Sequence, residues 1–372
     1  MYFKTFYKQQ TDTPLQYNID MLYAGVTPET IIPDIATPPE KTTIKTEFNR
    51  FNITNTTVLN CLNQHLDMLE HVPIEYTQYR IPKSSGGYRT ISAPSTQLKE
   101  LQRNVANYLL NLGATAHDAA YAYTPARTCK DALIKHQTAE NKWFYKFDIK
   151  DFFPSCTTDV LQNVLQNIYP FCCMPSVTLL KLIQLATYQN ALPQGSPLSP
   201  LLSNIVLTEF DFKMQFSVRA FNGVYTRYAD DILISLPEHH ELLFIQNIVK
   251  QNLKTVSETF KINTDKSRCG SIKGSNWNLG LMLNAENKIT LGHDKKMKLK
   301  AKINNFIFDF TNQNYWSIID TQVLQGEVNY FKTIEPEYAT FVINRLEQKY
   351  RQQSRRTLAE MFSAIISERV HR

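Results

Sequence analysis

Two adjacent aspartates, Asp230 and Asp231, stand between two β-rich runs and constrain this chain more than any other feature of its sequence. The runs cover 224–228 and 232–235, so the pair is expected at the bend of a β-hairpin. Adjacent carboxylates in an apolar setting repel each other, and a fold that keeps them needs cations nearby. Taken alone, the pair is also typical of a solvated turn, because aspartate is common in turns.

A third acid changes that balance. Asp148 ends a separate apolar segment, 143–149, whose composition predicts a buried strand. Three carboxylates from two strands can hold two cations about 4 Å apart, the geometry that stabilises the attacking and leaving oxygens in phosphoryl transfer. Oxygen-only ligation suits magnesium. We therefore expect Asp148, Asp230 and Asp231 to be metal ligands and catalytic residues, with two Mg²⁺ ions, or Mn²⁺ in their place, as cofactors.

The remaining pattern predicts an α+β fold. The order strand, helix, hairpin, helix, strand indicates an antiparallel sheet of the split βαβ class with helices on one face, and the pattern becomes helical after 295. The sequence Ser-Ser-Gly-Gly at 84–87 predicts a hairpin turn, because glycine adopts positive φ angles. Helices are expected at 58–71, 97–112, 158–168, 177–186, 197–210 and 240–260, and further strands at 78–82, 88–92, 269–272 and 278–283.

Composition excludes several other classes. The chain has 372 residues and is 43% hydrophobic, enough for two or three compact units. It has no run of about 18 uncharged apolar residues and no apolar signal core at its start, so we expect a cytoplasmic protein with no membrane partner. Its 6 cysteines form no C-x-x-C pair, which argues against a zinc or redox site.

The positive charge is concentrated near the C-terminus. The formal net charge is +6, which permits a polyanionic partner. A solvated helix face explains one basic cluster as well as nucleic acid does, but two clusters beside a set of catalytic acids favour nucleic acid. The clusters are Lys295, Lys296, Lys298, Lys300 and Lys302, and Arg345, Lys349, Arg351, Arg355 and Arg356.

Three motifs in order resemble the shared core of bacterial reverse transcriptases. They are Phe-Asp-Ile-Lys-Asp-Phe-Phe at 147–153, Leu-Pro-Gln-Gly-Ser-Pro-Leu-Ser-Pro at 192–200 and Tyr-Ala-Asp-Asp at 228–231. The resemblance runs from about residue 79 to about residue 337. It implies DNA synthesis on an RNA template from deoxynucleoside triphosphates, with Asp148 and Asp230 as the main metal ligands and Asp231 as a supporting acid.

The same resemblance implies a right-hand polymerase with fingers, palm and thumb. The palm would contain the split βαβ antiparallel sheet, and the thumb would be helical. The expected boundaries are an N-terminal arm at 1–50, fingers at 51–140 with a contribution from 158–190, palm at 141–290 and thumb at 291–372.

The nucleotide pocket is assigned partly by this resemblance. Lys83 and Arg89 lie on a hairpin similar to the fingers hairpin that closes over the triphosphate, where an ammonium and a guanidinium bind phosphate oxygens. Asp151 and Phe152 resemble positions whose backbone amides face the triphosphate. Phe153 resembles the aromatic residue that lies against the sugar, where a bulky ring excludes a 2′-hydroxyl and selects deoxynucleotides.

Further residues complete the expected site. Gln194 resembles the family residue that contacts nucleotide and template. Lys266 resembles a lysine that protonates the leaving pyrophosphate, although an ordinary exposed lysine explains it equally well. Leu279 and Gly280 are similar to the hairpin that holds the primer end, where glycine permits close backbone approach.

The class of reverse transcriptase stays open. The segment 324–330, Leu-Gln-Gly-Glu-Val-Asn-Tyr, resembles the thumb of group II intron and retron enzymes. Two retron signatures are altered: Ala-Leu-Ile-Lys-His at 132–136 replaces Asn-Ala-x-x-His, and Asn-Leu-Gly at 278–280 replaces Val-Thr-Gly. The chain most resembles stand-alone reverse transcriptases of antiphage defence, which work with a dedicated structured non-coding RNA as partner.

Other activities remain as alternatives. Template-independent or protein-primed polymerisation would use the same residues. A non-catalytic RNA-binding scaffold is disfavoured, because it has no need for the mutual repulsion of three acids. RNA template and DNA product are the expected partners, and an oligomer stays possible.

Overall fold

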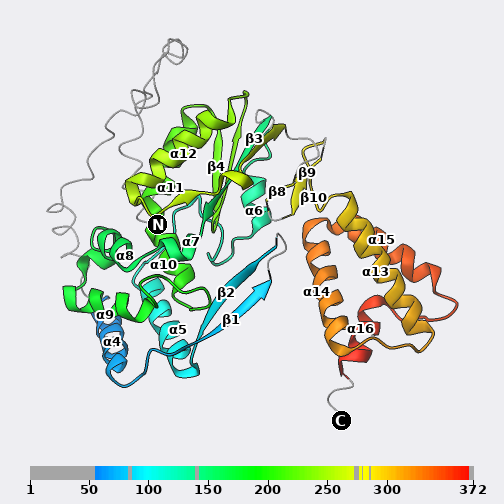
Figure 1. Cartoon of the computed structure of the whole chain (residues 1–372). Helices are drawn as coiled ribbons and strands as arrows, with labels where there is room; N and C mark the ends of the chain where they lie inside the picture. Colours follow the sequence, from blue (N-terminus) through cyan, green and yellow to red (C-terminus); the bar gives the residue numbers. More distant parts are fainter. Residues whose placement is uncertain are drawn as a thin grey trace. The chain divides into compact units, whose positions relative to one another are not determined.

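The structure is a computed structural model that describes residues 55–82, 86–138, 142–271, 276–278, 280–284 and 286–367 (Figure 1). The chain divides into two units, Met1–Asn55 and Thr56–Arg372. The expected arm at 1–50, Lys83 and Leu279 lie outside the described residues.

A five-stranded antiparallel sheet carries the three acids. Its strand order is β4-β5-β3-β6, and β7 also pairs with β3, at residues 143–146, whereas β6 pairs with it at Ile149 and Lys150. The predicted strands at 143–149, 224–228 and 232–235 are confirmed within one residue at each end. The strands are β3 (Trp143–Lys150), β4 (Val224–Tyr228), β5 (Asp231–Leu236), β6 (Lys261–Ile262) and β7 (Arg268–Ser271).

Strand alternation divides the sheet into two faces. Tyr145, Phe147 and Ile149 of β3 point into one core, where α11 (Thr208–Arg219) and α12 (Leu242–Val256) pack on the sheet. Phe144, Lys146 and Asp148 therefore lie on the opposite face. That face is also covered, because Phe144 belongs to a second core. The expectation of helices on one face only was thus incomplete.

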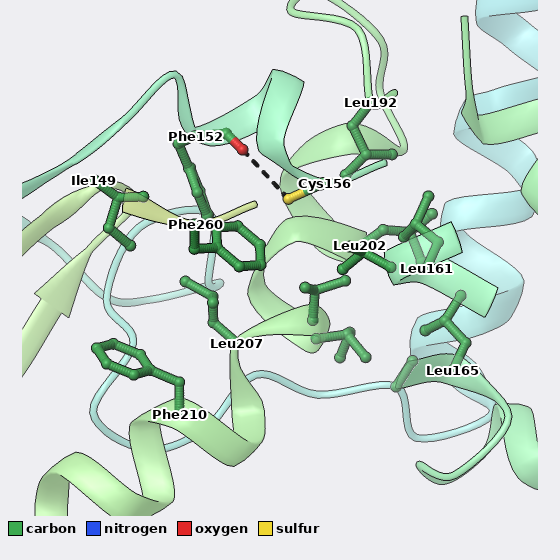
Figure 2. Packing of buried hydrophobic residues seen from close by; sticks show 14 of the residues in the cluster. Ile149, Phe152, Cys156, Leu161, Leu165, Leu192, Leu202, Leu207, Phe210 and Phe260 are labelled. Carbon is green, nitrogen blue, oxygen red and sulfur yellow. Dashed lines mark hydrogen bonds between the residues drawn. The ribbon is translucent and has the colours of Figure 1, made fainter. Parts of the chain in front are cut away.

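The first core continues from the sheet into a group of helices from 55–111 and 152–206 (Figure 1). Ile149 and Phe152 meet Phe260 and the leucines of α8 and α10 there (Figure 2). The predicted hairpin is confirmed as β1 (Tyr76–Pro82) and β2 (Tyr88–Pro94), which form a separate two-stranded sheet. The other elements here are α4 (Asn55–Asp67), η2 (Met68–Glu70), α5 (Thr96–Asn111), α7 (Phe152–Ser155), α8 (Thr158–Leu165), η3 (Phe171–Cys173), α9 (Ser176–Ala186) and α10 (Ser199–Val206).

The single helix expected at 197–210 is two helices. α10 ends at Val206 and α11 begins at Thr208, with Leu207 at φ −90° and ψ 8° between them. Neither glycine nor proline marks the break, so the residue pattern could not reveal it. The break matters because Asn204 of α10 and Asp211 of α11 both bind Arg227 of β4.

The C-terminal part is helical, as predicted. A small sheet of order β10-β9-β8 precedes four helices that share the second core with Phe144 and Leu233. Leu133 of α6 (Cys129–Ile134) belongs to the same core. None of the described helices combines the length and apolar character needed to cross a bilayer. The elements are η4 (Thr264–Lys266), β8 (Asn276–Asn278), β9 (Leu281–Leu283), β10 (Ile289–Thr290), α13 (His293–Thr311), α14 (Ile318–Ile334), α15 (Pro336–Lys349) and α16 (Leu358–Ser367).

Candidate active site

The three aspartates meet at one end of the sheet. Asp148 and Asp231 are direct cross-strand partners on β3 and β5, and Tyr228 pairs with Asp231 across the hairpin. Ala229 and Asp230 therefore form the turn. The Asp230 carbonyl accepts a 2.9 Å hydrogen bond from the Ile149 backbone N–H, which ties the turn to β3.

The turn depends on an unusual backbone angle. Ala229 has φ +57°, a left-handed conformation that costs a non-glycine residue about 1–2 kcal/mol. Such a conformation persists only where neighbouring contacts hold it. The backbone at the three acids is thus fixed by its surroundings rather than by local preference.

Two lysines pair with the acids. Lys146 lies two residues before Asp148 on the same face of β3, and its ammonium is 3.0 Å from Oδ2 of Asp231. The Lys266 ammonium is 2.9 Å from Oδ2 of Asp148. The backbone N–H of Asn263 donates to the Asp148 carbonyl at 2.8 Å, which brings the segment that carries Lys266 to the site. Lys266 thus lies beside the acids.

Within the described part of the chain, Asp230 forms no such ion pair, and its electrostatics reflect this. Burial, followed by the charges of Asp231 and Asp148, raises the pKa of Asp230 to about 6, and Lys266 opposes the shift only weakly. Burial disfavours the charge of Lys266, but its hydrogen bond to Asp148 and the charges of the three acids together outweigh that burial and raise its pKa. The site therefore holds more negative charge than its lysines neutralise.

That excess of charge fits divalent cations. Within the described residues, no group of three or more acidic, histidine or cysteine side chains converges closely enough to hold a metal ion as it stands. The lysines explain this, because Asp148 and Asp231 each point to an ammonium. The donor set still fits Mg²⁺, since all three side chains are carboxylates and three acids face two lysines.

Aromatic residues lie next to the acids and form what we call the aromatic wall of the site. Asp151, at φ +47°, turns the chain from β3 into α7. The Phe152 side chain is buried in the first core beside Phe260, which anchors this short helix (Figure 2). Phe153 is half-buried, and its ring lies 6.3 Å from the ring of Tyr123. Phe153 is thus placed at the site end of β3, whereas the Phe152 ring is a core residue.

Tyr123 connects this wall to the acids and to the β1–β2 hairpin. Burial and the charge of Asp230 raise the pKa of Tyr123, while Arg89 opposes the shift. The charges of Asp230 and Arg89 therefore shift the pKa of the same hydroxyl in opposite directions. The predicted cation Arg89 is exposed on β2, and its charge acts on Tyr123.

Gln194 lies where the 192–200 motif meets β2. Its carbonyl accepts a 2.7 Å hydrogen bond from the Ser92 backbone N–H. Its side-chain Oε1 is buried with no hydrogen-bond partner among the described residues. The next residue, Gly195, has φ +123°, and a Cβ there would lie 2.6 Å from the Ser92 carbonyl oxygen. Glycine is thus required for this contact.

Gly280 lies in the turn between β8 and β9 with φ +89°, a conformation that favours glycine. Its carbonyl accepts a 3.4 Å hydrogen bond from the Lys295 ammonium at the start of α13. The segment expected as one strand at 278–283 is therefore a hairpin, as the resemblance to a primer-holding hairpin implied.

Two site residues were missed from sequence. Lys146 could have been found, because a residue two positions from Asp148 on a strand shares its face. Tyr123 could not, since it stands in an irregular segment with φ +58° and only the fold brings it to Phe153.

The basic cluster at 295–302 contains lysines that form ion pairs within the protein and lysines that are exposed. Lys296 pairs with Glu335 at 3.2 Å, and Lys302 pairs with Glu327 at 2.7 Å, so both link α13 to neighbouring helices or their connection. Lys298 on the same helix is exposed. Some lysines of the cluster at 295–302 thus form ion pairs within the protein, and only the others are left for the expected contact with nucleic acid.

Comparison with known proteins agrees with this geometry. Residues 81–300 match the family described as "Reverse transcriptase (RNA-dependent DNA polymerase)". The chain is 31% identical to the Retron Ec73 reverse transcriptase of Escherichia coli over 285 residues, 74% of this chain and 87% of that protein. It is 30% identical to the Retron Ec83 reverse transcriptase of Escherichia coli over 284 residues, 74% of this chain and 86% of that protein.

More distant matches include a curated relative and a solved structure. The Retron Mx65 reverse transcriptase of Myxococcus xanthus is 26% identical over 284 residues, 73% of this chain and 64% of that protein. Among solved structures, apo telomerase from Candida Tropicalis aligns with a TM-score of 0.48 and 12% identity over 78% of this chain and 62% of that chain.

The altered signatures at 132–136 and 278–280 left it open whether the chain is a retron reverse transcriptase. The similarity to the two Escherichia coli enzymes shows that it belongs to the retron class. His136, the part of the first signature that is kept, is fully buried and bonded to β4 and β5. Its role in this fold is therefore structural. The chain belongs to the reverse transcriptases of the retron type, which are RNA-directed DNA polymerases.

Proposed function

We propose that this chain copies a structured non-coding RNA into DNA by a two-metal mechanism and that it acts in bacterial antiphage defence. The observation that carries the catalytic part is the meeting of Asp148, Asp230 and Asp231 at one sheet end with unrelieved negative charge. A scaffold would gain nothing from that repulsion.

Asp148 and Asp230 would hold the divalent ions, and Asp231 would support them. Bound Mg²⁺ supplies Lewis-acid stabilisation of the attacking and leaving oxygens. Asp148 would then exchange its contact with Lys266 for the ion. The released ammonium of Lys266 would lie beside the triphosphate, where it could protonate the leaving pyrophosphate.

Nucleotide selection would fall to the aromatic wall. Phe153 would lie against the sugar and leave no space for a 2′-hydroxyl, and Tyr123 would support its ring from the other side. Arg89 and Lys83 would bind the triphosphate, with the backbone amides of Asp151 and Phe152. The free Oε1 of Gln194 would accept a hydrogen bond from the nucleotide or the template.

The parts of the chain correspond to a right-hand polymerase. We assign fingers to 51–140 with 158–190, palm to 141–290 and thumb to 291–372, with an arm at 1–50. The second core joins α13 to α16 and continues to Phe144 and Leu233 of the central sheet, which supports a helical thumb that packs on the palm. Gly280 and Leu279 would hold the primer end next to it.

The proposal of an RNA partner is based on the relatives of this chain. Retron reverse transcriptases are the relatives at about 30% identity, and their family copies RNA with divalent ions. The exposed residues of the two basic clusters, Lys298 and Arg345 among them, offer positive charge to an RNA backbone. We place the protein in the cytoplasm, where such an RNA and the deoxynucleotides occur.

The partner is tested by crosslinking the chain to RNA in its native host and sequencing the bound RNA. We expect one structured RNA to dominate, with DNA complementary to it in wild-type cells and none in cells that carry Asp230→Asn. Phage plating on both strains tests the defence role, with lower plating expected only on the wild type. Uniform recovery of cellular RNAs, or equal plating, would contradict the respective claim.

A further inference from the structure

A buried ion pair lies under the catalytic turn, on the face of the sheet opposite Asp148 and Asp231. Arg227 of β4 and Asp211 of α11 are both fully buried. The guanidinium binds the carboxylate through two hydrogen bonds, Nε to Oδ1 at 2.8 Å and Nη2 to Oδ2 at 2.6 Å. The Tyr225 hydroxyl donates to the same Oδ1 at 2.6 Å. Every oxygen of Asp211 thus has a donor.

The third nitrogen of Arg227 reaches the catalytic hairpin. Nη1 donates to the Ala229 carbonyl at 3.0 Å and to Oδ1 of Asn204 at 3.0 Å. Ala229 is the residue with the left-handed φ of +57°, and its carbonyl belongs to the peptide unit that begins Asp230. The guanidinium therefore holds the peptide that sets the direction of the Asp230 side chain.

The same network reaches the aromatic wall. The Arg227 backbone pairs with the segment before Tyr123: its N–H donates to the Ala119 carbonyl at 2.7 Å, and its carbonyl accepts from Tyr121 N–H at 2.8 Å. The Asn204 amide donates to the Ala122 carbonyl at 2.8 Å. One buried cluster thus fixes both the turn that carries Asp230 and the strand-like segment that presents Tyr123.

Stability alone does not explain such a cluster. Removing two charges from water is costly, and apolar residues of similar volume often replace a buried ion pair without loss of stability. A fork-shaped guanidinium differs from an apolar side chain in that it fixes the direction of several acceptors at once. The geometry therefore points to orientation of the site as the reason for the pair.

We infer that Arg227, held by Asp211, Tyr225 and Asn204, is a positioning residue that fixes Asp230 for metal binding and catalysis. The inference rests on the catalytic role proposed for Asp230. Arg227 itself is fully buried behind the turn, so it would act through Asp230 and not by touching substrate or metal.

Two variants separate positioning from stability. Arg227→Lys keeps the charge but loses the fork, so the Ala229 carbonyl and Asp211 cannot both be held. The triple variant Asp211→Leu, Tyr225→Phe, Arg227→Met replaces the cluster by apolar volume and leaves no buried charge. His136→Gln is the matched control, because His136 binds Thr226, the neighbour of Arg227 on β4, from the opposite face of the sheet.

The readouts are Mn²⁺ binding by calorimetry, kcat and KM for single-nucleotide addition, and the unfolding midpoint. We expect Arg227→Lys and the triple variant to lower kcat about 100-fold per folded molecule, the cost of a misplacement of about 1 Å, and to weaken Mn²⁺ binding at least tenfold. The triple variant should keep its unfolding midpoint. The control should keep kcat and Mn²⁺ affinity even if its midpoint falls.

Wild-type kcat and Mn²⁺ affinity in Arg227→Lys or in a folded triple variant would overturn the inference while leaving the proposed function intact. Asp230→Asn is measured in parallel. Wild-type activity in Asp230→Asn would instead refute the proposed role of Asp230, and the inference with it.

Discussion

His136 lies between α6 and the central sheet with both ring nitrogens hydrogen-bonded. Nδ1 is 2.6 Å from the Ser235 hydroxyl and Nε2 is 2.8 Å from the Thr226 hydroxyl, and the side chain has 0% exposure. Each hydroxyl can donate or accept, so these bonds tolerate either protonation state. Burial alone therefore lowers the pKa of His136, from 6.5 to about 3.

This shift makes stability depend on pH with a definite sign. Between pH 6.5 and pH 3 the unfolded chain protonates His136 and the folded chain does not, so acid favours unfolding. Each pH unit in that window costs about 1.4 kcal/mol, which gives a loss of about 2 kcal/mol between pH 7 and pH 5. The raised pKa of Asp230 acts in the opposite direction, because the folded chain binds a proton at this carboxyl more readily than the unfolded chain does, so acid stabilises the fold there.

Urea denaturation at pH 7 and pH 5 measures this loss when the wild type is compared with His136→Gln. Glutamine offers a donor and an acceptor to the two hydroxyls but does not titrate. Asp230 is present in both proteins, so its contribution cancels in the comparison. The wild type should lose about 2 kcal/mol more than the variant on acidification. An equal loss in both proteins would refute the assignment of His136 as a buried neutral residue.

Three further predictions concern the site. Phe153→Ala should lower the preference for deoxynucleotides over ribonucleotides, measured as the ratio of kcat/KM values, by at least about tenfold, and an unchanged ratio would remove Phe153 from sugar selection. Gly195→Ala should raise KM for nucleotides and destabilise the fold by about 1–3 kcal/mol, because its φ is +123° and the new Cβ would clash with the Ser92 carbonyl; a wild-type KM and melting temperature would contradict this. Mn²⁺ affinity should fall about tenfold per pH unit below pH 6, because protonation of Asp230, whose pKa is about 6, competes with the ion; calorimetry that finds constant affinity from pH 7 to pH 5 would exclude Asp230 as a ligand.

The acids and their strands could be predicted because each follows from local pattern. The runs beside Asp230 and Asp231 are β-rich, and a two-residue turn between them leaves the acids at its bend. The alternation of β3 places Asp148 on the same face as Lys146. These relations need only residue type and strand period, whereas the register that sets Asp148 opposite Asp231 comes from the pairing of two distant strands.

The rest depends on contacts between distant segments. The break at Leu207 has no glycine or proline, and its effect appears only where Asn204 and Asp211 both bind Arg227. Tyr123 reaches Phe153 only because Arg227 pairs with the segment that precedes it. Sequence pattern carries no signal for such convergence, because each residue would fit an ordinary loop or core position.

Primer extension on an RNA template of known sequence, with Mg²⁺ and deoxynucleotides, tests the central claim most directly. The wild type is compared with Asp230→Asn plus Asp231→Asn, which keeps side-chain size and removes two charges. Template-matched DNA from the wild type alone is the predicted result. Template-matched DNA from the variant at the wild-type rate would contradict the assignment of the catalytic acids.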